Sequence, residues 1–311
     1  MLAGMFSRAG AQGIGKVARM ITGSTAGVGL DPFARQLADK MRGVYAPNVI
    51  VENRPGAGNR LAVDAMRGAP ADGTAMLFTP ASPITIYPHL YKSLPYDPFK
   101  DLIAVSTTFT FKMGLVVGPA CPARTLAEYL EWIKANPKNA SYGTPGAGTV
   151  PHFLAVNFGQ QAGVTLVHVP YKGAAYWQDI LGGQLPAVFS PISRDTVGRH
   201  QDGKVRILAM AEQSRTKRLP QVPTFAESGF PKLVIDEWFG IFLPAATPPQ
   251  IVTALHQALT TALREPEVVK MLDLFDSEPQ PISPADFATR VRADYDFWAS
   301  TVRSSGFKLD D

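Results

Sequence analysis

Residues 16–33 read KVARMITGSTAGVGLDPF and place an apolar run, a glycine-rich segment and a helix start in immediate succession. The apolar run, residues 16–22, predicts a buried strand, and residues 23–29 predict a tight turn. Asp31 followed by Pro32 predicts the helix start, with Asp31 as N-cap, because aspartate caps helices well and proline suits the first turn. A spacing of four residues then predicts that the buried face of this helix comprises Phe33, Leu37 and Met41.

The same strand, loop and helix unit recurs along the chain. Further strands are predicted at residues 49–51, 75–78, 140–143, 166–169, 186–189 and 205–211. Helices are predicted at residues 59–67 and 149–158, around Trp177, Ile180 and Leu181, and at residues 247–263, 265–275 and 283–304, with Thr149 and Ser283 as expected N-caps. Strands that alternate with helices indicate an α/β fold with mostly parallel sheets flanked by helices. Ligands of such sheets bind outside the carboxyl ends of the strands.

Two apolar segments that end near prolines, residues 113–118 and 238–243, are typical of crossings between two lobes. The first lobe is therefore expected to comprise residues 16–112 and 244–311. The second lobe is expected to comprise residues 119–237, because this part of the chain builds strand and helix units of its own.

Composition excludes several classes of protein. The 311 residues are 46% apolar, with a net charge of +4 and no block of Lys and Arg, so we expect no nucleic-acid partner. No apolar run approaches the roughly 20 residues of a membrane helix, so we expect no direct membrane insertion. Cys121 is the only cysteine, which excludes an internal disulfide. Residues 1–15 are interpreted either as the remnant of a signal peptide or as a disordered terminus.

Six motifs stand in a characteristic order. They are VENRPGAG (51–58), APADG (69–73), LPYDP (94–98), HVPYKG (168–173), PQVPT (220–224) and WFG (238–240). In this order and spacing the chain resembles the Bug family, the TctC-like receptors of tripartite tricarboxylate transporters. The resemblance extends from Lys16 to about Lys308.

The resemblance implies a two-lobed type II periplasmic-binding-protein fold, joined by two crossing segments. It implies a periplasmic receptor that closes on a small carboxylate and delivers it to membrane transporter subunits. The carboxylate would be a di-, tri- or aromatic acid. It also implies that the protein is no enzyme and needs no cofactor. We further expect a monomer.

A carboxylate site can be built here without basic side chains. Helix N-termini present free N–H groups and a partial positive charge, and glycine allows close approach of the backbone. The expected ligand contacts are Thr25, Ala26, Gly27, Gly29, Thr79, Ala81, Ser82, Thr144, Gly146, Ala147, Thr149, Gly173, Ala174 and Ser190. Tyr171 and Phe189 are candidates for an aromatic pocket wall, with core packing as the alternative. The two crossing segments would act as a hinge.

The sequence departs from the family pattern at two positions. Members usually carry Gly-Gly-x-x-Asp at the first loop, whereas residues 26–31 read AGVGLD. Ser190 stands where members often have an aspartate. The absence of that carboxylate removes an acceptor for a ligand ammonium, which disfavours an amino acid as the ligand. Lys172 can be interpreted as a partner of the ligand or as a solvated side chain.

Features of other function classes are present in the sequence but incomplete. Gly27 and Gly29 form G-x-G, but the third glycine of a dinucleotide-binding loop is missing. Ser24 lies on a strand-to-helix turn without the frame of a nucleophile elbow. His152 and His168 lack partners at metal-ligand spacing, so no metal is expected. A receptor that signals to a membrane partner remains an alternative to a transport receptor.

Overall fold

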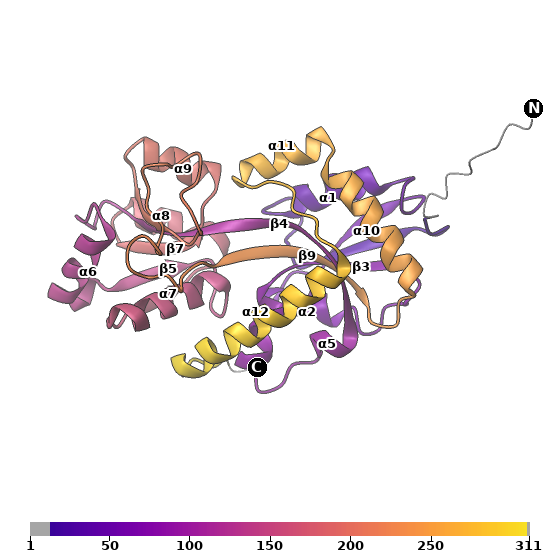
Figure 1. Ribbon diagram of the computed structural model, residues 1–311, viewed down its shortest axis with the longest axis horizontal. Coiled ribbons are helices and arrows are strands. Elements are labelled where there is room, and N and C mark those ends of the chain that lie inside the picture. The colour runs from indigo at the N-terminus through magenta and orange to yellow at the C-terminus, as the bar shows by residue number, and fades with distance from the viewer. Residues whose placement is uncertain (1–12, 310–311) are drawn as a thin grey trace, which may run out of the picture.

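The computed structural model describes residues 13–309 and has two lobes joined by two long strands (Figure 1). The interpretation of residues 1–15 falls mainly on residues 1–12, which lie outside the described part. Within that part, Ile14 donates its amide to the carbonyl of Tyr45 at 2.7 Å and so is already bonded to the first lobe.

The first lobe contains a mixed sheet. Its strands are β2 (Val49–Asn53), β1 (Ala18–Thr22), β3 (Ala75–Pro80), β9 (Asp236–Pro244) and β4 (Leu102–Val117), in this spatial order. β1 pairs with β2 and β3 in parallel, whereas β9 runs antiparallel to both β3 and β4. The carboxyl ends of β1, β2 and β3 therefore meet at one edge of the sheet.

The second lobe repeats this plan. Its strands are β5 (Ser141–Thr144), β6 (Val167–Pro170), β7 (Ala187–Pro191) and β8 (Arg206–Met210). β5 pairs in parallel with β6 and β7, and the last part of β4 pairs antiparallel with β7 and β8. The expected α/β fold with two lobes is confirmed.

A single strand, β4, belongs to both sheets. Its residues 102–112 pair with β9, and its residues 113–117 pair with β7 and β8. β9, in turn, pairs with first-lobe strands over residues 236–244. The expected crossing segments thus lie within or next to regular strands, and the lobe boundaries remain a prediction.

Helices cover both sheets. In the first lobe they are α1 (Asp31–Met41), α2 (Arg60–Asp64), α3 (Ser82–Thr85), α4 (Tyr87–Leu90), α5 (Pro98–Asp101), α10 (Pro249–Leu263), α11 (Pro266–Leu274) and α12 (Pro284–Ser305). In the second they are α6 (Leu126–Ala135), α7 (Val150–Ala162), α8 (Tyr176–Leu181) and α9 (Arg194–Gln201). Short 3₁₀ turns are η1 (Ala57–Asn59), η2 (Pro137–Asn139) and η3 (Gly173–Ala175).

The ends of the helices test the expected caps. Ser283 caps α12, because its hydroxyl accepts from the Asp286 amide at 3.1 Å. The expected role of Asp31 as the N-cap of α1 is wrong: Leu30 holds that position and Asp31 is the first helical residue. The buried face predicted for α1 is confirmed, since Phe33, Leu37 and Met41 have no exposed surface.

Aromatic side chains fill the region where β4 and β9 run together. Phe109 and Phe239 stack with ring centroids 5.2 Å apart, and Trp238 meets Phe287 of α12 edge to face at 5.0 Å. α12 continues beyond its own lobe and lies beneath α7 (Figure 1), where Trp298 contacts Phe153 with centroids 6.2 Å apart. The second lobe is therefore held by α12 as well as by the two strands.

Candidate ligand-binding cleft

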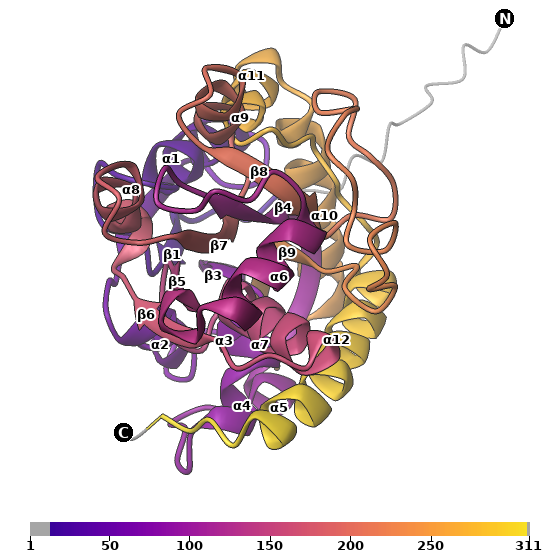
Figure 2. The ribbon, with the colours of Figure 1, turned by 90° about the vertical axis from the view of Figure 1, so that its left-hand side faces the viewer.

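The loops of interest come from both lobes and face the same side of the molecule. Figure 2 shows α8 and β6 of the second lobe on the side of α1 and α2, with β4 and β9 on the opposite side. One contact joins the two sets of loops directly, since the first amide of α7, at Val150, donates to Ser82 Oγ of α3 at 3.2 Å. The loops of the two lobes therefore meet next to the start of α7.

Asp31 organises the loop between β1 and α1 in place of the expected cap. Its carboxylate has no exposed surface and accepts bonds from the Gly27 amide at 2.7 Å, Arg35 Nε at 2.8 Å and Asn53 Nδ2 at 2.7 Å. Burial raises the pKa of Asp31, but these three donors outweigh burial and hold it below its usual value. Asn53 also donates to the Ser24 carbonyl at 2.9 Å. The Asp31 carboxylate therefore occupies the Gly27 amide, which was expected to bind the ligand.

Other amides of this loop stay available. Among residues 13–309, the backbone N–H groups of Thr25, Ala26 and Gly29 have no acceptor, and all three residues are exposed. Gly27 and Gly29 have φ of +77° and +61°, a conformation that glycine adopts without strain. The loop therefore presents three donors at the start of α1.

The second predicted group, Thr79, Ala81 and Ser82, lies in the interior. Thr79 is fully buried in β3, and the Ala81 amide donates to the Trp238 carbonyl at 3.0 Å. Ser82 is 2% exposed and its hydroxyl donates to Glu237 Oε1 at 3.1 Å. In this conformation their hydrogen-bond donors are bonded to acceptors within the protein.

The second-lobe loop between β5 and α7 is closed by two threonines. The hydroxyls of Thr144 and Thr149 both donate to the Gly146 carbonyl, at 3.0 and 2.8 Å. Thr149 precedes α7 but forms no side-chain cap, contrary to expectation. Within the described chain, the amides of Gly146, Ala147 and Thr149 have no acceptor. This loop mirrors the first, with three donors at a helix start.

Two histidines contact this loop, and no spacing in the sequence predicts that they pair. The rings of His152 and His168 stack with centroids 4.0 Å apart. His168 Nε2 lies 2.7 Å from Thr144 Oγ1, and His152 Nδ1 accepts the Gly148 amide at 3.2 Å. Burial lowers the pKa of His152 to about 3 and that of His168 to about 4, so both rings are neutral at pH 7. Neutral rings can support the loop without attracting the ligand.

These histidines should make stability fall in acid. Below about pH 6.5 the unfolded chain binds protons that the folded imidazoles refuse, so the unfolding free energy declines as pH falls towards about 4. We expect His168→Gln, which keeps a donor for Thr144, to remove about 2 kcal/mol of that decline between pH 6.5 and 4.5. Urea unfolding across this range measures it. Above pH 7.5 the unfolding free energies of the wild type and His168→Gln should depend on pH equally. Equal dependence below pH 6.5 as well would contradict a neutral, buried His168.

The remaining predicted residues fall into two groups. Gly173 and Ala174 are exposed at η3, and the Gly173 amide donates to the Pro145 carbonyl at 3.0 Å. Tyr171 is half-buried beside them and its hydroxyl donates to Asp179 at 2.6 Å. Phe189 and Ser190 have no exposed surface. In this conformation the structure places Tyr171 near the loops and Phe189 in the core, where it packs against aromatic rings.

Glu237 is a buried acid that was not among the predicted site residues. It lies on β9 with 8% exposure, accepts from Ser82, and forms none of the ion pairs found in residues 13–309. Burial raises the pKa of Glu237 to about 7. A charged residue next to the apolar run WFGIFL was the signal available in the sequence.

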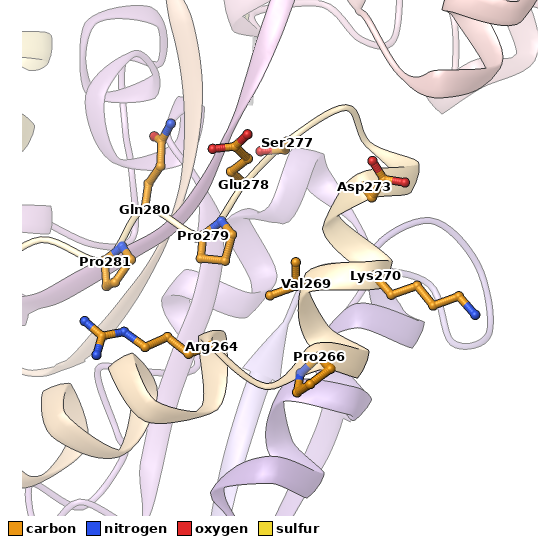
Figure 3. Close-up of a pocket in the computed structure, with 10 residues that line it drawn as sticks. All are labelled: Arg264, Pro266, Val269, Lys270, Asp273, Ser277, Glu278, Pro279, Gln280 and Pro281. Atoms are coloured by element: carbon orange, nitrogen blue, oxygen red, sulfur yellow. The ribbon is translucent and has the colours of Figure 1, made fainter.

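Cavities also occur away from these loops. A groove of about 950 Å³ lies between α10, α11 and residues 277–281, with Arg264, Val269 and Pro279 around it (Figure 3). Prolines contribute three of its lining residues and have no N–H to offer an anion. A neighbouring cavity of about 490 Å³ contains Lys112 and Glu212. Neither cavity includes the free amides described above.

No group of three or more His, Cys, Asp and Glu side chains in residues 13–309 could hold a metal ion. Over that part of the chain, no helix combines the length and apolar character needed to cross a bilayer.

Comparison with known proteins agrees with this fold. BugT of Bordetella pertussis is 30% identical over 300 residues, covering 94% of this chain and 90% of BugT. A protein of R. palustris with adipate superposes with a TM-score of 0.81 at 26% identity, covering 93% of this chain and 98% of that one. MatC from Rhodopseudomonas palustris with bound malate gives a TM-score of 0.79 at 25% identity, covering 93% and 99%.

The family described as "Tripartite tricarboxylate transporter family receptor" matches residues 33–305. Members of this family are transport receptors rather than enzymes, as the motifs predicted. The chain therefore belongs to the TctC family of tripartite tricarboxylate transporter receptors, and it is a solute-binding receptor.

Proposed function

We propose that this receptor captures a small carboxylate between its lobes in the periplasm and delivers it to a tripartite tricarboxylate-type membrane transporter. The observation that carries the proposal is the pair of loops that start α1 and α7, each with three amides that have no acceptor within residues 13–309. Anions bind at helix starts because free N–H groups and the helix dipole both favour negative charge.

The shape of the proposed ligand follows from two donor sets. One carboxylate would accept from Thr25, Ala26 and Gly29, and a second group would accept from Gly146 and Ala147. Adipate and malate, the ligands of the two structural neighbours, each carry two carboxylates. This supports a dicarboxylate in preference to a neutral sugar, while an aromatic acid would need Tyr171 as its wall.

A thermal-shift screen tests the ligand class. At a hundredfold excess over Kd, a ligand adds about 2.7 kcal/mol of stability, which raises Tm by roughly 4 °C in a protein of this size. We expect such shifts with malate, adipate or other di-, tri- and aromatic carboxylates. Glucose and other neutral sugars are the controls. Shifts with neutral sugars alone would contradict the proposal.

Delivery would follow from closure of the lobes. The ligand would bind the first lobe through residues 25–29, and the second lobe would close on it through residues 144–149 and 173–175. Rotation would be absorbed where β4 changes partners, near Met113. We expect one chain to bind one ligand as a monomer, which sedimentation of the loaded receptor measures.

A further inference from the structure

A chain of two hydrogen bonds joins the start of α7 to a buried acid on β9. The Val150 amide donates to Ser82 Oγ at 3.2 Å, and Ser82 Oγ donates to Glu237 Oε1 at 3.1 Å. All three residues are at least nine-tenths buried. Because the serine proton points at Glu237, the serine lone pair is left for the amide. Glu237 thereby sets the orientation of the Ser82 hydroxyl. Within residues 13–309, Ser82 is the only first-lobe side chain that is hydrogen-bonded to the first turn of α7.

No Lys, Arg or His side chain in residues 13–309 forms an ion pair with Glu237. Tyr87 of α4 and Asp236 of its own strand are the titratable groups coupled to it, and Asp236 is paired with Arg290 of α12. Arg60 of α2 lowers the pKa of Tyr87, but among the charged groups only Asp236 shifts the pKa of Glu237 itself. On α7, His152 is neutral, and on β4, the Lys112 ammonium is paired with Asp276.

A ligand carboxylate at the start of α7 would bring a second negative charge towards this acid. The free amides of Ala147 and Thr149 precede Val150 by one to three residues, and Val150 is bonded to the serine that Glu237 orients. Two carboxylates that share a poorly hydrated region cannot both ionise cheaply. The cost disappears when Glu237 takes up a proton, and its other oxygen still accepts from Ser82.

We propose that Glu237 is a positioning residue that holds α7 against the first lobe through Ser82 and takes up a proton when a carboxylate binds. The proton uptake rests on the proposed function, because it needs a carboxylate ligand. The bridge, meaning the two hydrogen bonds that join Val150, Ser82 and Glu237, does not depend on the ligand. The raised pKa of Glu237 that burial causes, about 7, supports the proposal because it makes proton uptake feasible near neutral pH.

The bridge can be tested without any ligand. We expect the carboxyl carbon of Glu237, assigned in ¹³C NMR spectra by its loss in Glu237→Gln, to titrate about two pH units above an ordinary glutamate. The Ser82 bond lowers the pKa of Glu237, so Ser82→Ala should move this midpoint further upward. An ordinary midpoint, or one that Ser82→Ala leaves in place, would overturn the bridge.

Proton uptake is tested by calorimetry with malate and with adipate, between pH 6 and 8.5, in buffers of different ionisation enthalpy. Wild-type protein should take up as much as one proton, and its affinity should weaken by up to about tenfold per pH unit above the midpoint. Glu237→Gln should bind with a flat pH profile.

Glu212→Gln is the matched control. Burial raises the pKa of Glu212 to about 7 as well, but this acid lies in the cavity beside Lys112, whose lining includes no residue of the two loops at 25–29 and 144–149. The Glu212→Gln variant should take up as many protons on ligand binding as the wild-type protein does. Malate or adipate binding with a pH-independent affinity in wild-type protein would overturn the coupling. If neither acid binds, the carboxylate assignment fails for both, and the NMR titration still decides the bridge.

Discussion

Asp31→Ala is expected to lower the free energy of unfolding by about 3 kcal/mol and to weaken carboxylate binding by about 100-fold. The substitution removes the buried carboxylate that accepts from the Gly27 amide, Arg35 Nε and Asn53 Nδ2, and a hydrogen bond to a charged group contributes about 1.5–3 kcal/mol. It also releases the loop whose free amides at residues 25, 26 and 29 are the proposed anion site.

Urea unfolding and calorimetry with malate or adipate measure these two effects. Asp39→Ala is the matched control, because Asp39 lies on the same helix and makes only an exposed ion pair with Arg42. We expect Asp39→Ala to change stability by less than about 0.5 kcal/mol and to leave affinity intact. If Asp31→Ala bound the acid as tightly as wild type, the first loop would not be the anion site.

Gly148→Ala is expected to cost about 3 kcal/mol of stability and to weaken binding by at least about tenfold. Gly148 has φ of +75°, and a Cβ at this position would lie 2.9 Å from Leu90 Cδ1 and 3.0 Å from Leu309 Cδ1. Both leucines belong to first-lobe segments. The added methyl group would therefore push the second-lobe loop away from the first lobe, in addition to straining the backbone.

The control is Gly163→Ala, which separates strain from contact. Gly163 ends α7 with φ of +64° and has open space around the position of a Cβ. Its replacement should cost about 1–2 kcal/mol through the backbone alone and should leave affinity unchanged. Equal losses of stability in the two variants, or unchanged affinity in Gly148→Ala, would show that contact between the lobes at Gly148 does not matter.

Much of the fold could be predicted because its signals are local. The apolar run before residues 23–29, the repeat of Phe33, Leu37 and Met41, and the Ser283 cap each depend on a few neighbouring residues. The six motifs likewise identified the family. Asn53, inside the motif VENRPGAG, acquires a physical explanation only from the structure, where it joins Asp31 to the Ser24 carbonyl.

The candidate site was predicted less completely. Residues at the carboxyl ends of strands were expected to contact the ligand, and the structure brings Ser82 of the first lobe next to Val150 of the second. It also turns Thr79, Ala81 and Ser82 inward, and leaves Phe189 in the core. Position after a strand predicts where a residue lies along the chain, but the direction of its side chain depends on what packs over it.

The sequence alone therefore determined the α/β architecture, the receptor family and the two glycine-containing loops at helix starts. Only the tertiary structure decided which amides of those loops are free. An amide is free or occupied according to the acceptor that folding brings to it, and such acceptors come from distant parts of the chain. Asn53 bonds Asp31 across 22 positions, Val150 bonds Ser82 across 68, and Ser82 bonds Glu237 across 155. No local pattern of residues encodes contacts at those separations.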